Sequence, residues 1–288
     1  MSLESFRYAF QPYPLDTFIT CVYRAIPMRI FSFRNLRVLI LLVTLAVVAN
    51  YVKDQKLVTQ GWYQTLEIVV YPINPANSPK VQRYIDSLKS SDFSRIDKFI
   101  KRESEKYDIV TSEPTKTRLG QTLQVIPPQP PQSKNNILQA IIWSLKLRYW
   151  VWKNAPDEPN EKYLVRMFVL FHDLSNQRLQ HSVGLQKGLV GIVNAYGAKS
   201  QARQNNIVIA HEFFHTVGAT DKYNEFGHPI PPYGLGDPTK SPIYPQRRAE
   251  IMAGRRAISP NESEMPRGFK SIVLGDKTAQ EIGWINNL

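Results

Sequence analysis

The sequence predicts a mixed α/β (α+β) domain that follows an apolar, membrane-type helix. Three observations lead to this fold class. An uncharged apolar run lies near the start, strand-like runs rich in branched residues alternate with amphipathic helices, and a further helix follows the last of these strands. The chain has 288 residues, 43% hydrophobic and 21% charged, which is typical of a folded protein with one large domain and an appendage.

The apolar run covers residues 38–52 and contains no charged side chain, whereas Arg34 and Arg37 precede it. Its fifteen residues would span about 22 Å as a helix, less than a hydrocarbon core of roughly 30 Å. Leu36 and the long flanking basic side chains can extend the segment. We therefore expect a membrane helix at 36–52.

This helix is either a single-pass anchor or a signal segment that is removed, and Met28 offers an alternative start with a compact basic lead. Five arginines against two acidic residues give residues 1–52 a net charge of +3. By the positive-inside rule, an anchor keeps the basic segment 1–35 in the cytoplasm. Either alternative exports residues 53–288, which we expect to be a periplasmic or extracellular domain.

The net charge of the whole chain is +12, which leaves +9 for residues 53–288. Because the basic residues are scattered and form no run, we expect a solvated basic surface and no nucleic-acid partner. Cys21 is the single cysteine, so no intramolecular disulfide can form. A metal site in this chain must therefore use histidine and carboxylate ligands.

Strands and helices are expected along the exported part from their periodicity and composition. The expected strands are 66–71, 163–171 and 189–196, with the shorter and more polar segment 181–188 as an edge strand. The expected helices are 79–107, 135–153 and 202–217. Four prolines between 127 and 131 predict an extended loop.

The last of these helices carries the pattern H-E-x-x-H at His211, Glu212 and His215. Helix positions four apart lie on one face, so both imidazoles can reach one metal ion. Glu212 lies beside the first ligand, where it can take a proton from a metal-bound water. If the histidines only packed in the core, Glu212 would be buried without an evident partner, which is costly.

Gly218 follows His215 by three residues, and Asp221 follows Gly218 by three. Glycine can adopt a positive φ and end a helix with a sharp turn, which would bring Asp221 back towards the ion. Asp221 is therefore the expected third ligand, since zinc accepts carboxylate oxygens. The alternatives for this position are Glu225, His228 and Glu250.

The stretch 211–221, HEFFHTVGATD, resembles the metzincin zinc-protease signature H-E-x-x-H-x-x-G-x-x-H, with Asp in the place of the third His. The resemblance implies a zincin-like domain with a mixed, twisted sheet and a small C-terminal subdomain that contains a methionine turn. The segment 250–254, EIMAG, resembles that turn, with Met252 as its methionine. The segment 181–188 matches the substrate-aligning edge strand. The resemblance covers roughly 181–254 and indicates no particular subfamily.

Some features depart from the metzincin pattern. The third ligand is Asp, and no Tyr follows Met252 at the spacing that some metzincins use for an extra ligand. Tyr223 could stabilise an oxyanion, but we expect it to pack against the site. We expect neither His172 nor His181 to take part at the metal, although His181 belongs to the expected edge strand near the cleft.

The resemblance implies a zinc-dependent endopeptidase that acts on a peptide or protein substrate, with Zn²⁺ on His211, His215 and Asp221 and with Glu212 as general base. The alternative is a catalytically silent, membrane-tethered protein that keeps the zincin fold for binding or scaffolding. The complete H-E-x-x-H pattern favours the enzyme, because a decayed site often loses the Glu.

Overall fold

The computed structural model describes residues 32–131, 137–155, 164–176, 179–186 and 188–285. The expectations for Cys21, for Met28 and for nearly all of the basic segment 1–35 lie outside these residues. The chain divides into two compact units, Met1–Tyr51 and Val52–Leu288, each of which is described by itself. We call Val52–Leu288 the C-terminal unit.

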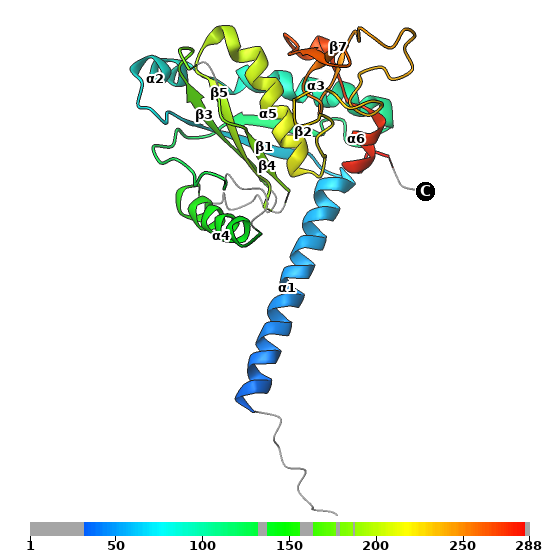
Figure 1. Ribbon diagram of the computed structural model, residues 1–288. Helices are drawn as coiled ribbons and strands as arrows, with labels where there is room; N and C mark the ends of the chain where they lie inside the picture. The colour runs from blue at the N-terminus through cyan, green and yellow to red at the C-terminus, as the bar shows by residue number, and fades with distance from the viewer. Residues whose placement is uncertain (1–31, 132–136, 156–163, 177–178, 187, 286–288) are drawn as a thin grey trace, which may run out of the picture. The chain divides into compact units, whose positions relative to one another are not determined.

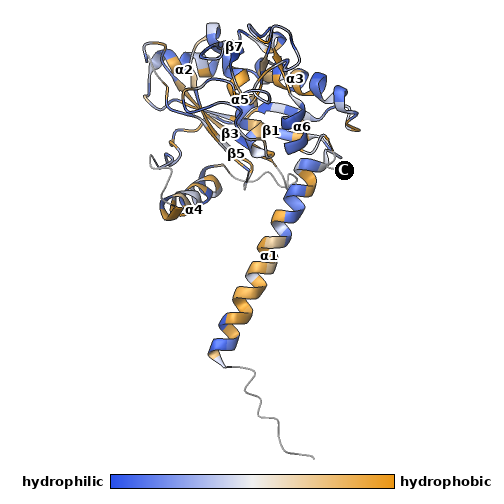
Figure 2. Ribbon diagram, turned by 45° about the vertical axis from the view of Figure 1, so that its right-hand side comes forward, coloured by the Kyte–Doolittle hydropathy of each residue, from blue (hydrophilic) through white to orange (hydrophobic). Residues whose placement is uncertain are grey.

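The first described element is helix α1, Phe33–Gly61, with 29 residues. In the part of the chain that the structure describes, it is the one helix long and apolar enough to cross a membrane, and a signal sequence would share these properties. The helix continues beyond the expected segment 36–52 and includes charged residues. At 1.5 Å per residue its 29 residues are about 43 Å long. Figure 2 shows this change from an apolar to a polar surface along the helix.

The C-terminal unit is a mixed α/β fold built on a five-stranded mixed sheet of order β2-β1-β3-β5-β4 (Figure 1). The strands are β1 Leu66–Ile73, β2 Thr115–Leu119, β3 Val165–His172, β4 Val183–Leu185 and β5 Val190–Tyr196. All neighbours pair in parallel except β4, which is antiparallel to β5 at the sheet edge. The edge strand expected within 181–188 is therefore present, though shorter.

Helices cover both faces of this sheet, because alternate strand residues enter two separate apolar clusters. One face packs against α2 Pro79–Asp86, α3 Ser94–Ser104 and α5 Ala202–Thr216. The other face packs against α4 Ile137–Asn154 through Leu147 and Trp150. Both faces of the central strands are thus buried, as their nearly continuous apolar runs predict.

The expected single helix 79–107 is wrong. Helix α2 ends at Asp86, and Lys89 is extended, with φ −132° and ψ 155°. The Asp92 carboxylate accepts a hydrogen bond from the Lys89 backbone and starts a new turn, which leads into α3. Because apolar residues occur at helical spacing on both sides of the break, periodicity alone did not reveal it. The 3₁₀ helices of the unit are Ser90–Phe93, Glu105–Tyr107, Lys199–Gln201 and Phe269–Ser271.

The chain after α5 contains two small strand pairs and one more helix. Strand β6 Ala249–Glu250 pairs in parallel with β9 Ile272–Val273, and β7 Arg256–Ser259 forms a hairpin with β8 Glu262–Glu264. Helix α6 Asp276–Glu281 follows. These elements are too short to give a periodic signal, so the sequence did not predict them.

Strand β2 is attached to α3 by one carboxylate. Asp97 accepts hydrogen bonds from the hydroxyls of Thr115 and Thr117 and from the Thr117 backbone N–H, at 2.7–3.0 Å. Both threonines are buried, so loss of the acceptor would leave buried donors unpaired.

We therefore expect Asp97→Ala to lower the free energy of unfolding by about 1–3 kcal/mol. Chemical denaturation of the full chain in detergent measures this change. The exposed Glu105→Ala is the control, and we expect it to change the free energy by no more than about 0.5 kcal/mol. Equal stability of the two variants would contradict the role of Asp97.

Candidate metal centre

Helix α5 carries the candidate metal centre, and its position is fixed at its start by Asn205. The Asn205 side chain donates to the carbonyl oxygen of Tyr196 at 2.8 Å and accepts from the Tyr196 N–H at 3.2 Å. This joins the helix to the end of β5, while Ile209, Phe213 and Phe214 bury its inner face completely. His211 and His215 lie one turn apart on this fixed helix.

His211, His215 and Asp221 place three ligand atoms close together, and this group could hold a metal ion. The two Nε2 atoms are 3.1 Å apart, and the Asp221 Oδ1 atom is 3.2 Å from the first and 3.0 Å from the second. Three donor atoms at nearly equal separations form a triangle, which offers one face to a cation. The structure thus brings Asp221, the expected third ligand, together with the two histidines.

Both histidines are oriented by backbone carbonyls. Nδ1 of His211 is 2.9 Å from the carbonyl oxygen of Ile251, and Nδ1 of His215 is 2.8 Å from that of Ala219. A carbonyl oxygen only accepts hydrogen bonds, so each Nδ1 carries a proton, and each Nε2 faces the Asp221 carboxylate. Outer hydrogen bonds of this kind are typical of metal-binding histidines.

Gly218 provides the turn that brings Asp221 back to the helix. Its φ is +115°, a conformation in which a side chain is strained. The Gly218 and Ala219 N–H groups bond back to the carbonyl oxygens of His215 and Phe214, which closes the end of α5. The glycine expected to end the helix therefore does so.

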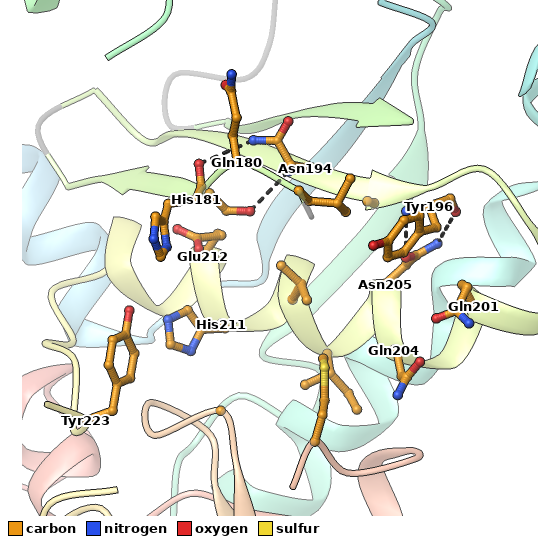
Figure 3. A pocket seen from close by; sticks show the side chains of 17 residues that line it. Gln180, His181, Asn194, Tyr196, Gln201, Gln204, Asn205, His211, Glu212 and Tyr223 are labelled. Atoms are coloured by element: carbon orange, nitrogen blue, oxygen red, sulfur yellow. Dashed lines mark hydrogen bonds between the residues drawn. The ribbon is translucent and has the colours of Figure 1, made fainter. Parts of the chain in front are cut away.

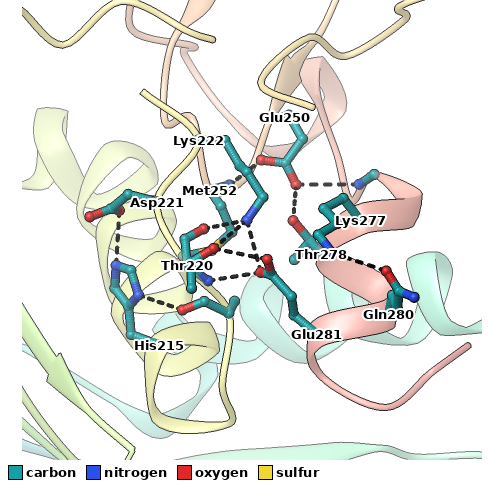
Figure 4. A network of polar contacts seen from close by, with 12 residues as sticks. His215, Thr220, Asp221, Lys222, Glu250, Met252, Lys277, Thr278, Gln280 and Glu281 are labelled. Carbon is teal, nitrogen blue, oxygen red and sulfur yellow. Dashed lines mark hydrogen bonds and ion pairs between the residues drawn. The ribbon is translucent and has the colours of Figure 1, made fainter. Parts of the chain in front are cut away.

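The segment around Asp221 is held by Glu281 on α6 (Figure 4). The Glu281 carboxylate accepts hydrogen bonds from the Thr220 N–H and hydroxyl, both at 2.9 Å. It also forms a 2.8 Å ion pair with the side chain of the buried Lys222. The backbone N–H of Lys222 donates to the carbonyl oxygen of Met252. Both chain neighbours of Asp221 are thus fixed, although the Asp221 side chain itself is partly exposed.

The electrostatics of the cluster favour an added positive charge. Burial lowers the pKa of the His211 imidazole, but the hydrogen bond to Asp221 and the charge of Glu212 outweigh it and raise the pKa to about 9. Burial raises the pKa of Asp221, but hydrogen bonds from His211 and His215 outweigh it and bring the pKa well below its usual range. A metal cation at this position would supply positive charge in place of the proton.

Glu212 lies beside this triangle but is not part of it. Its side chain is buried, and its Oε2 atom has no hydrogen-bond partner in the described part of the chain. Burial raises its pKa, while the neighbouring imidazoles and the Gly184 backbone lower it by a smaller amount. Because a buried polar atom without a partner is costly, this oxygen points to a missing ligand or water.

A cavity of about 370 Å³ runs along α5 from the metal centre (Figure 3). His211, Glu212, His181 and Tyr223 lie at one end of it, and Tyr196 and the polar side chains of the first turns of α5 lie at the other. His181 therefore lies near the cleft, as the sequence predicted. The Tyr223 ring is 6.3 Å from that of His211, in a stacked arrangement.

Strand β4 lies directly against the metal-site helix at Gly184. A Cβ atom there would be 2.4 Å from the Glu212 carbonyl oxygen and 2.5 Å from Cβ of His215. Only glycine permits this approach. The edge of the sheet is therefore held next to the H-E-x-x-H turn.

The turn at 250–254 is held together by Glu250. This buried carboxylate accepts hydrogen bonds from the N–H groups of Met252 and Ala253 on one oxygen, and from Thr278 and Gly275 on the other. Both of its oxygens therefore already accept hydrogen bonds that stabilise the turn. Met252 itself is fully buried in the core cluster.

The other residues considered for the site lie elsewhere. The ligand group among the described residues contains none of the alternative third ligands, Glu225, His228 and Glu250. His172 is bonded to Asn194 at 2.9 Å, away from the cluster. Sequence reasoning missed Glu281 and Lys222, because both act across long stretches of chain that no local pattern connects.

Comparison with known protein families and with curated proteins finds no match. The class that the fold and the site define is therefore a mixed α/β protein with a His/His/Asp group that could hold a metal ion.

The Glu281 network predicts an effect on metal binding at a distance from the ligands. Glu281→Ala should free Thr220 and Lys222, and we expect the affinity for a divalent metal to fall about 10–100-fold, as for other outer-shell changes. Titration against a chromophoric chelator measures this affinity. The control is Glu264→Ala, which removes an exposed ion pair with Arg256 and should leave the affinity unchanged. A wild-type affinity in Glu281→Ala would show that Asp221 needs no such support.

Proposed function

We propose that this chain is a zinc-dependent endopeptidase of metzincin type, with His211, His215 and Asp221 as metal ligands and Glu212 as general base. One observation carries the proposal. Three ligand atoms at 3.0–3.2 Å from one another stand beside a buried carboxylate oxygen that has no partner among the described residues.

The donor set fits zinc. Zinc bonds of about 2.0–2.1 Å in a tetrahedral arrangement separate neighbouring ligand atoms by about 3.3 Å, close to the separations in this cluster. Two imidazoles and one carboxylate leave the fourth position of a catalytic site open. Bound there, zinc would lower the pKa of a water molecule and polarise the scissile carbonyl.

The residues around the metal centre would have separate roles in the reaction. The free Oε2 of Glu212 would accept a proton from the attacking water and then deliver it to the leaving amine. The carbonyls of Ile251 and Ala219 hold the two imidazoles in the tautomer that the chemistry needs. Tyr223 closes one side of the cavity beside His211.

The substrate would bind as an extended strand along β4. This strand pairs with β5 on one side only, since it ends the sheet. A peptide can therefore add to its outer edge through main-chain hydrogen bonds. Gly184 brings that edge next to Glu212, so the bound peptide would pass the general base.

Further features support the metzincin resemblance and not only a metal site. The antiparallel edge strand precedes the helix that carries the ligands, Gly218 turns the chain between the second and third ligands, and Met252 lies in a tight turn that contacts the site through Ile251. We further propose that α1 is a membrane anchor and that residues 53–288 lie outside the cytoplasm, because the arginines precede the apolar segment.

Replacing Glu212 should reduce catalysis without reducing zinc binding. We expect Glu212→Gln to keep its zinc but to lose about 10²–10⁴-fold in kcat/KM, because the amide cannot accept the proton. Peptide cleavage assays and metal analysis of the same preparation measure both quantities. Glu225→Gln, at an exposed carboxylate outside the ligand group, serves as the control. Wild-type cleavage by Glu212→Gln would exclude this mechanism.

The role of Asp221 as third ligand can be tested against that of His228, one of its alternatives. Asp221→Ala should lower zinc affinity by more than about 100-fold, beyond the effect typical of outer-shell changes. His228→Ala should leave it unchanged. Chelator competition measures both affinities, and full zinc occupancy of Asp221→Ala would remove that residue from the site.

Cleavage of an unbiased peptide library, with and without chelator, distinguishes the enzyme from a silent binding protein. The full chain should cut extended peptides, and the chelator should abolish cutting. Stoichiometric zinc without any cleavage would favour the scaffolding alternative.

A further inference from the structure

Helix α4 is apolar on two opposite faces. Its inner face packs on the sheet through Leu147 and Trp150, with Trp143 and Val151 partly buried beside them. Its outer face exposes seven large apolar residues, each at 51–75% exposure: Ile137, Leu138, Ile141, Ile142, Leu145, Tyr149 and Trp152. A contiguous exposed apolar patch of this kind marks an interaction site.

The exposed residues form one stripe. Positions 138, 141, 145, 149 and 152 recur at intervals of three and four, which places them on one side of a helix. Two aromatic side chains, Tyr149 and Trp152, end the stripe with ring centroids 5.8 Å apart. Such amphipathic rings are enriched at the level of lipid headgroups.

The charges of α4 match an anionic surface. The helix carries Lys146, Arg148 and Lys153, all exposed, and its sequence contains no acidic residue. At 100° per residue, Arg148 lies at one border of the apolar stripe and the two lysines at the other. This combination of an apolar face and flanking basic residues is typical of helices that lie in a membrane interface.

The position of α4 within the C-terminal unit agrees with a lipid partner. Within this unit α4 lies towards the same end as the segment 52–61, where the unit begins (Figure 1). The residues just before this segment belong to the helix that is apolar enough to cross a membrane. A tether of this kind raises the effective concentration of the lipid surface at the unit.

We propose that the outer face of α4 lies in the interface of an anionic lipid bilayer and forms a second membrane contact of the C-terminal unit. The proposal rests on α1 as a membrane anchor and is independent of the metal centre. The occupant is lipid, because the stripe is bordered by basic residues and the chain itself brings the unit to a membrane.

The test places an environment-sensitive fluorophore on single cysteines of the full chain in a Cys21→Ser background. The protein is reconstituted into nanodiscs of phosphatidylcholine and phosphatidylglycerol that contain nitroxide-labelled lipid. Leu145→Cys reports on the outer face of α4, and Leu45→Cys on the apolar part of α1. Lys98→Cys, at an exposed position on α3, is the matched control.

We expect the lipid nitroxide to quench the Leu145 and Leu45 labels at least twofold more than the Lys98 label. Replacing phosphatidylglycerol by phosphatidylcholine should weaken quenching at Leu145 alone. Quenching at Leu45 with none at Leu145 would overturn the α4 contact while leaving the anchor intact. A blue-shifted but unquenched Leu145 label would mean that a second protein copy covers the stripe, which also overturns the proposal. Absence of quenching at Leu45 would overturn the anchor, and the α4 proposal with it.

Discussion

The convergence of two imidazole nitrogens and one carboxylate oxygen within about 3 Å is the constraint on which the rest of the site depends. A positive charge stabilises such a group, and the hydrogen bonds among these residues accordingly raise the pKa of His211 and lower that of Asp221. The surrounding structure supplies what a bare cluster lacks. Backbone carbonyls fix the two rings, a glycine reverses the chain, and the ion pair between Lys222 and Glu281 holds the loop of the third ligand.

The local part of this arrangement could be predicted from the sequence, because helix geometry alone places His211 and His215 on one face and Glu212 beside them. Asp221 could be predicted through Gly218, since one residue with a positive φ sets the direction of the returning chain. The core strands were also evident from their apolar runs. These features depend on neighbours only a few residues away.

What the sequence did not reveal depends on contacts between distant segments. Strand β2 contains one large apolar residue, Leu119, and is a strand because it pairs with β1 and because Asp97 binds its threonines. The break after α2 depends on a cap at Lys89 that the apolar spacing conceals. Trp152 lies on the exposed face of α4, whereas Trp150 of the same helix packs on the sheet. The periodicity of that helix could not reveal which of its two apolar faces meets the sheet.

The hydrogen bonds between Thr220 and Glu281 join residues that are 61 positions apart. A ribosome makes the chain from its N-terminus, so the histidines and Asp221 emerge well before the carboxylate that steadies them. During synthesis the ligand loop is therefore made before the residue that supports it. This order of appearance makes the folding of α6 the step that completes the support of the ligand loop.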